Sequence, residues 1–156
     1  MAARITRTLC RLNNTIGVVL LALLDEIREK LSKYPDATFE SDDSSITVRP
    51  NSPGGFPVAF MDCASEYIVS LGGWHDHFDN SDEALDIFFT GLTTHSRISV
   101  SIRGYTEYKW TPELLGDNEW VPSSTCGLLF FPFWRRVVQT IQQNDIVPHP
   151  DSDTIE

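Results

Sequence analysis

The chain has few cysteines, and it has no apolar run long enough to cross a bilayer. Cys10, Cys63 and Cys126 are an odd number and show no CxxC spacing. This pattern disfavours a disulfide framework and predicts a reducing, cytoplasmic compartment. The longest apolar stretch, residues 16–24, is too short to span a membrane. Arginines precede it as in a signal peptide, but no small-residue cleavage site follows; a secreted precursor stays the alternative.

The motifs of several common enzyme classes are also missing. The sequence contains no Walker loop, no GxGxxG, no HExxH, no EF-hand and no GxSxG. No βαβ unit with a glycine-rich turn is predicted, which disfavours a doubly wound nucleotide fold. The sequence therefore favours a protein that is not an enzyme, and it leaves the question open.

Basic residues are scarce relative to acidic ones. Twelve Lys and Arg stand against twenty-two Asp and Glu, a formal net charge of -10. The imbalance is concentrated after residue 35, where six basic residues face nineteen acidic ones. Such a charge repels phosphate backbones and attracts basic proteins. We therefore expect no nucleic acid as a partner, and a basic protein is the better candidate.

Length and pattern together predict one domain. The 156 residues are 41% hydrophobic, an ordinary globular balance. We expect a single domain over residues 1–145 and a disordered acidic tail over 146–156, where prolines and acids dominate. The order helix, strands, helix, strands predicts the α+β class. In this architecture an antiparallel β-sheet carries a long N-terminal helix and a short central helix packed on one face.

Two helices follow from apolar residues at helical spacing. The first is predicted over residues 14–33, with a wide apolar stripe that favours either burial in the core or a homodimer through this helix. The second is predicted over residues 82–90. Asn80 or Ser81 is its expected N-cap, with Glu83 completing a capping box if Asn80 is the cap, and Gly91 is its expected left-handed stop.

Period-two alternation predicts the strands. It is clearest over residues 97–103, where apolar and polar side chains alternate without exception. Residues 133–143 fit either a helix or a strand. Further strands are predicted over residues 46–49, 105–110 and 119–121. Residues 58–61 and 67–71 are predicted to form an antiparallel hairpin, and residues 127–131 a buried strand.

Histidines and acids gather in residues 72–85, which suggests a metal site. His75 and His77 are two residues apart, so in an extended segment both imidazoles face the same side. Asp79, Asp82 or the distant His95 is the candidate third ligand, with zinc or another divalent metal as the ion. Zinc sites use three or four protein ligands, and the spacing here defines only two. We therefore expect no cofactor, with metal binding or a metal-dependent hydrolase as the alternative.

A second set of candidate residues is aromatic and basic. Arg97 and Arg103 share one face of the strand 97–103, where they could bind an anion or pair with nearby acids. Trp110 and Trp120 flank a turn at Gly116 and are expected to lie near each other. With Trp74, these are the predicted binding residues for a partner or a small molecule.

These patterns rank three functions. The first is a non-enzymatic, acidic interaction protein that binds a macromolecule, for example an inhibitor or immunity-type protein for a basic partner. The second is a metal-binding protein or metal-dependent hydrolase centred on His75 and His77. The third is a small-molecule binding protein that uses the aromatic residues and the two arginines.

Overall fold

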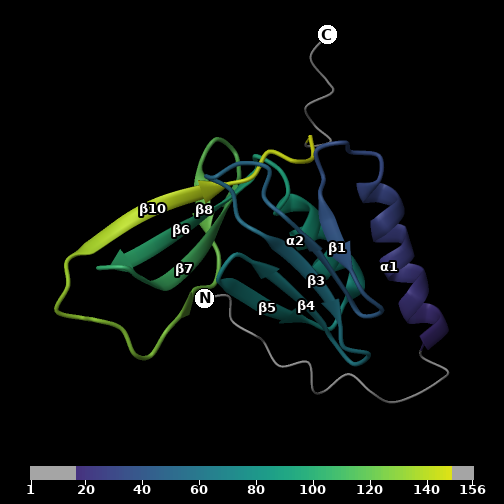
Figure 1. Ribbon diagram of the computed structural model, residues 1–156, viewed down its shortest axis with the longest axis horizontal. Helices are drawn as coiled ribbons and strands as arrows, with labels where there is room; N and C mark the ends of the chain where they lie inside the picture. Colours follow the sequence, from purple (N-terminus) through teal and green to yellow (C-terminus); the bar gives the residue numbers. More distant parts are fainter. Residues whose placement is uncertain (1–16, 149–156) are drawn as a thin grey trace, which may run out of the picture.

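The computed structural model describes residues 17–148, with side chains from residue 22 onward. This range contains two helices and ten strands. The strands form two five-stranded antiparallel sheets. Figure 1 shows the sheets as two lobes, with both helices on the side of the first sheet. The predicted α+β class is confirmed, and its strands are divided between two sheets.

The first sheet is a meander whose strands lie in chain order. The predicted antiparallel hairpin is confirmed, with Phe60 opposite Val69. Its last strand was not predicted, because histidines and an aspartate replace the usual β-branched residues there. That strand follows the Gly72-Gly73 turn, in which Gly72 has a φ of +59° that glycine adopts readily. The strands are β1 (Phe39–Ser41), β2 (Ser45–Val48), β3 (Val58–Asp62), β4 (Tyr67–Leu71) and β5 (Trp74–Phe78).

Both helices use their apolar face to cover this sheet. In α1 (Gly17–Leu31), the side chains of Leu24, Ile27 and Leu31 are buried in the core. The helix α2 (Ser81–Thr90) packs against β3 and β4. Of the two predicted caps, Asn80 is the one observed, its side chain accepting from the Asp82 N–H. Burial of these stripes is what holds both helices in place, since short helices are marginal in water.

Gly91 does not end α2 in the predicted left-handed conformation. Its φ of -60° and ψ of -19° are those of a right-handed helix. A Cβ at this position would lie 2.5 Å from the Leu71 Cδ2. The close approach of α2 to β4 therefore favours glycine here, and the prediction of a left-handed stop was wrong.

The second sheet begins with the predicted alternating strand. Ile98 and Val100 point into the core, while Arg97 and Ser99 on the other face are half-buried. For the ambiguous region 133–143, the strand alternative holds over residues 137–143. The strands are β6 (Ser96–Arg103), β7 (Thr106–Leu115), β8 (Trp120–Pro122), β9 (Cys126–Gly127) and β10 (Val137–Gln143), in the order β10-β6-β7-β8, with β9 also paired to β7.

A buried amide ties the end of β10 to the first sheet. The Asn144 side chain accepts from the Phe56 N–H and donates to the carbonyls of Phe56 and Gly91. Beyond Asp145, Ile146 and Val147 are buried, and both of their N–H groups donate to the Leu92 carbonyl. The folded domain therefore extends at least to Val147, beyond the predicted boundary at 145. Residues 149–156 of the predicted tail lie outside the described residues.

Candidate functional site

The two histidines of the predicted metal site lie on one face of β5. Both are exposed, and their ring centroids are 6.0 Å apart. The extended geometry expected for His75 and His77 is therefore present. His77 Nδ1 lies 2.9 Å from a carboxylate oxygen of Glu66, an interaction that fixes this ring at the sheet edge. The second imidazole has no equivalent carboxylate contact among the described residues.

Asp79 does not complete a metal site with them. It follows β5 as an exposed residue before the start of α2. Among residues 17–148, no three His, Cys, Asp or Glu side chains are grouped closely enough to hold a metal ion. Within the described part of the chain, two imidazoles therefore lie together without a third ligand, which is fewer than zinc sites use.

Trp74, a predicted binding residue, is part of the core instead. Its side chain is buried, and its indole N–H donates to the Ser124 hydroxyl. The Cys126 thiol donates to the His75 carbonyl nearby. These contacts join β5 of the first sheet to the segment around β9 of the second. Their role is to hold the two sheets together.

Arg97 is occupied by neighbours within its own sheet. Its Nε donates to the Glu113 carboxylate on β7, and its guanidinium lies 4.1 Å from the ring centroid of Trp120. The carboxylate offsets the charge of this arginine and the indole covers its ring-facing side, so part of what it could offer an external anion is already used. Arg97 therefore follows the second alternative given for this strand face, in which the arginine pairs with a nearby acid.

Trp110 and Trp120 are not neighbours across the turn. In the strand register Trp120 lies opposite Leu115, whereas Trp110 lies opposite Cys126, five residues earlier along β7. Trp110 packs against Gly73, where a Cβ would come within 2.2 Å of its ring. The prediction that the two indoles lie close together was wrong, because residues an odd number of positions apart point to opposite faces of a strand.

Of the segment predicted as a buried strand over residues 127–131, only Gly127 lies in a strand, the short β9, and the rest belongs to an exposed arm. We define the arm as residues 128–136, which connect β9 to β10. Five of its apolar side chains are exposed: Leu128 (45%), Leu129 (91%), Phe130 (91%), Phe133 (72%) and Trp134 (71%). An apolar run predicts burial only where a second layer covers it, and none of the described elements lies over the arm.

The arm has a defined conformation. Arg103 donates through Nη1 to the carbonyls of Phe133 and Arg135. Phe131 is half-buried and stacks on Tyr108 of β7, with ring centroids 4.3 Å apart. Arg103 therefore positions the arm, a role different from the anion binding predicted for it.

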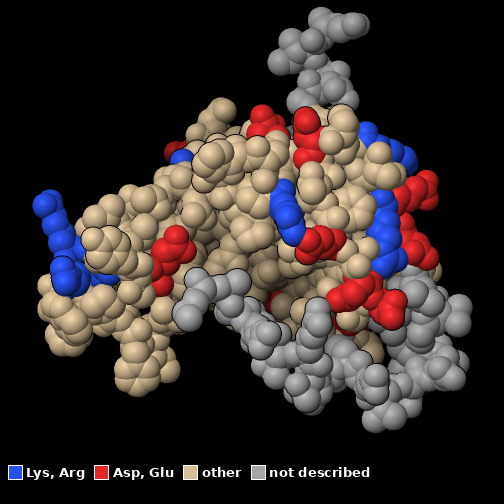
Figure 2. Space-filling view, in the orientation of Figure 1, with Lys and Arg blue, Asp and Glu red and all other residues tan. Residues whose placement is uncertain are grey.

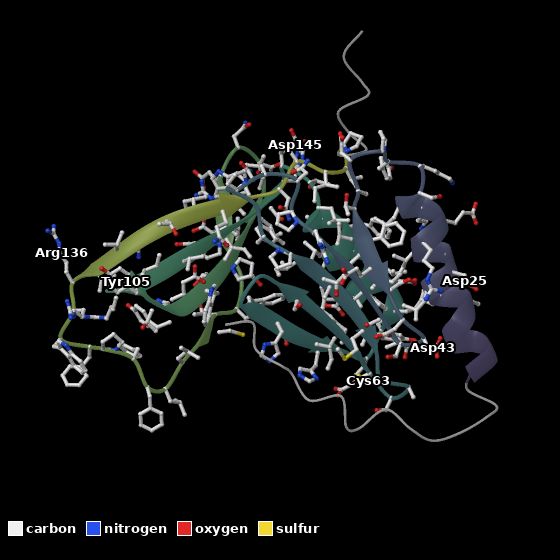
Figure 3. The ribbon with its side chains drawn as sticks, viewed as in Figure 1. Asp25, Asp43, Cys63, Tyr105, Arg136 and Asp145 are labelled. Atoms are coloured by element: carbon white, nitrogen blue, oxygen red, sulfur yellow. The ribbon has the colours of Figure 1, made fainter. Side chains whose placement is uncertain are left out.

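The arm side chains project away from both sheets. Figure 3 shows aromatic rings pointing outward from the connection between β9 and β10, with Tyr105 and Arg136 marking that end of the molecule. Tyr105, in the turn between β6 and β7, is fully exposed as well. Figure 2 shows basic side chains at this end and most acidic ones over the other lobe. The arm is thus an apolar surface with a basic margin on an acidic protein.

The arm was missed because an apolar run looks the same whether it is buried or exposed. One sequence signal was available, namely that Leu128–Phe131 does not alternate with polar residues and is followed at once by Pro132. A buried edge strand on a one-sided sheet would alternate. The residue pattern could therefore have predicted a loop over residues 128–131. It could not have predicted that the loop is exposed.

Neither helix of the described chain is long and apolar enough to cross a membrane. Comparison with protein-family models, curated proteins and solved structures finds no match to this chain.

Proposed function

We propose that this chain is a non-enzymatic binding protein that recognises another macromolecule, and that the arm is its docking surface. The observation that supports this most is the contiguous exposure of Leu128, Leu129, Phe130, Phe133 and Trp134. Single exposed apolar residues are ordinary, whereas a contiguous group of them is characteristic of interaction sites. Aromatic residues are also enriched at the energetic centres of protein interfaces.

The order within the arm strengthens the proposal. Arg103 holds two arm carbonyls, and Phe131 is stacked on the sheet beneath. A surface that is already ordered loses less conformational entropy when a partner binds. The arm therefore has both the apolar side chains and the preorganisation that favour tight docking.

The net charge of -10 favours a basic partner. Charge on the body of the protein accelerates encounter with an oppositely charged molecule, while the apolar contact determines how long the complex lasts. An inhibitor or immunity-type protein for a basic partner is one concrete form of this function. The cysteine content is consistent with a cytoplasmic setting, which belongs to the same proposal.

The test is affinity capture from native lysate at low and moderate salt. The wild type is compared with Leu129→Ser/Phe130→Ser, which removes the two most exposed arm side chains, and with Val121→Ser as a matched control. Val121 is 56% exposed on β8, outside the arm. We expect a specific basic protein with the wild type and the control, at both salt concentrations, and its loss with the arm variant.

Two outcomes would refute the proposal. If no specific protein is retained at either salt concentration, the chain does not act by stable binding. If the arm variant retains the partner as well as the control does, the arm is not the docking surface. Circular dichroism and thermal melting of each variant establish that the fold is unchanged.

The metal alternative rests on the shared face of His75 and His77. It requires a third ligand from outside the described residues or from a substrate. Metal content after purification without a histidine tag measures it directly. Sub-stoichiometric metal, together with no thermal shift on adding zinc, would remove this alternative.

The small-molecule alternative loses support from the internal contacts of Arg97 and Arg103. The homodimer through the first helix also stays a proposal. Leu24 of its stripe is buried in the chain's own core, and the side chain of Leu20 lies outside the described ones.

A further inference from the structure

The strands at the edges of the two sheets differ in how they are protected from pairing with another chain, and β9 is only two residues long. β1 and β8 have three residues each, and they contain Glu40 and Pro122, respectively. β5 carries an aspartate and two histidines. Short length, charge and proline are the features by which proteins prevent edge-to-edge association. These three edges are therefore protected.

β10 lacks all of these features. Its seven residues, Val-Val-Gln-Thr-Ile-Gln-Gln, include no charge, no proline and no glycine. Its pairing with β6 is regular over its whole length. Six of the seven side chains are exposed, Val138 and Ile141 by more than half. Figure 1 shows β10 along the outer edge of its sheet. Within the described chain, this is a long and unprotected edge.

One hydrogen bond shows which backbone groups of β10 point away from β6 and are available to pair with another strand. The Gln143 N–H donates to the Gly54 carbonyl, outside the sheet, and therefore points away from β6. In an antiparallel strand the N–H and C=O of one residue point to the same side, and the side alternates along the chain. The outward residues of β10 are thus Val137, Gln139 and Ile141. Their outward groups have no partner among the described residues.

We infer that β10 pairs antiparallel with β10 of a second copy of this chain, with Gln139 on the two-fold axis. This register pairs Val137 with Ile141 of the second copy, and each Gln139 with its equivalent. Each such pair exchanges both of its backbone hydrogen bonds. Shifting the register by two residues would leave one outward residue unpaired or require Gln143, whose N–H is already used. The second sheets of the two copies would then form one continuous sheet across the dimer.

The side chains are self-complementary in this register. On one face Val137 lies opposite Ile141, and on the other Val138 lies opposite Thr140, so the flanking pairs are all β-branched. Such cross-strand pairs stabilise a sheet. The absence of charge matters because two copies of a protein with a net charge of -10 repel each other overall, and an uncharged edge adds no like charges at the contact itself. A second copy is therefore the occupant that this edge fits best.

This inference is independent of the proposed function, because it concerns the purified chain alone. The experiment is analytical ultracentrifugation across a concentration series, with two variants at the axis. Gln139→Lys places like charges opposite each other, and Gln139→Thr is the matched neutral control. Because an edge contact is smaller than the ~800 Å² per partner of stable complexes, the series extends to about 0.5 mM, where a ~0.1 mM affinity is visible.

We expect a monomer–dimer equilibrium for the wild type and Gln139→Thr. Gln139→Lys should raise the dimer dissociation constant about tenfold or more, because like charges directly opposite each other are destabilising. Residue-resolved hydrogen exchange supplies the second readout. The amides of Val137, Gln139 and Ile141 become protected as concentration rises, whereas those of Val138 and Thr140 are protected throughout.

A wild type that stays monomeric over the whole series overturns the inference. So does a dimer that Gln139→Lys leaves unchanged, or one in which the three outward amides exchange freely. A dimer abolished by Leu20→Glu but not by Gln139→Lys would assign the interface to the first helix instead.

Discussion

Replacing Asn144 should destabilise the fold by removing hydrogen bonds that join its two sheets. Its side chain is 1% exposed. It accepts from the Phe56 N–H at 3.0 Å and donates to the carbonyls of Phe56 at 3.0 Å and Gly91 at 2.9 Å. One amide thus links the second sheet to the loop before β3 and to the end of α2.

Asn144→Ala would leave three buried backbone groups without their partner. A buried polar group deprived of its hydrogen bond costs about 1–3 kcal/mol, and water entering the vacated space offsets part of this. We therefore expect a loss of about 3–4 kcal/mol in the free energy of unfolding, which is large for a single substitution. Urea unfolding followed by tryptophan fluorescence measures it, since Trp74 is buried.

Asn144→Asp is the matched variant, because it has nearly the same shape. An aspartate retains the acceptor for the Phe56 N–H, but when ionised it places a carboxylate against two carbonyl oxygens. Burial and these oxygens raise its pKa above the unfolded value of about 3.9. The destabilisation is then largest at neutral pH and decreases as pH falls through the raised pKa, where the protonated acid donates again.

The reasoning fails if both variants remain within about 1 kcal/mol of the wild type at pH 7, a change expected of surface residues. It also fails if the deficit of Asn144→Asp relative to the wild type does not decrease with falling pH. Either result would mean that the amide is not the group that joins the two sheets.

Two further predictions concern packing and turn electrostatics. Gly73→Ala should destabilise the fold by about 2 kcal/mol, because the added Cβ would overlap the Trp110 ring. In a double-mutant cycle, Trp110→Leu should reduce this destabilisation. Additive effects of the two substitutions would contradict the clash. Asp42 has a lowered pKa because the Ser44 and Ser45 N–H groups donate to its carboxylate. Its stabilisation is therefore present above the ordinary pKa of 3.8 and is lost as pH falls through the lowered value. Asp42→Asn should cost at most about 1 kcal/mol at pH 7, because this exposed turn is screened by solvent, and almost nothing at pH 2; a deficit independent of pH in thermal melts would argue against the charge.

The elements whose burial follows a local pattern were predictable from the order of the residues alone. The helical spacing of Leu24, Ile27 and Leu31 predicted the face of α1 that is buried. The alternation of Ile98 and Val100 with polar residues predicted β6, and Asn80 predicted the start of α2. In each case a repeat of two or about four residues reports one buried face, because strand and helix geometry fix which residues share it.

Tertiary structure decided where apolar residues without such a pattern lie. Leu129 and Phe130 read as a buried strand, but the described chain has no layer to cover them, so they form the exposed arm. Ile146 and Val147 read as a disordered tail, yet a site beside Leu92 buries them. Both pairs are apolar, and the difference is whether another part of the chain is close enough to exclude water. That is a property of the assembled fold, and no window of neighbouring residues contains it.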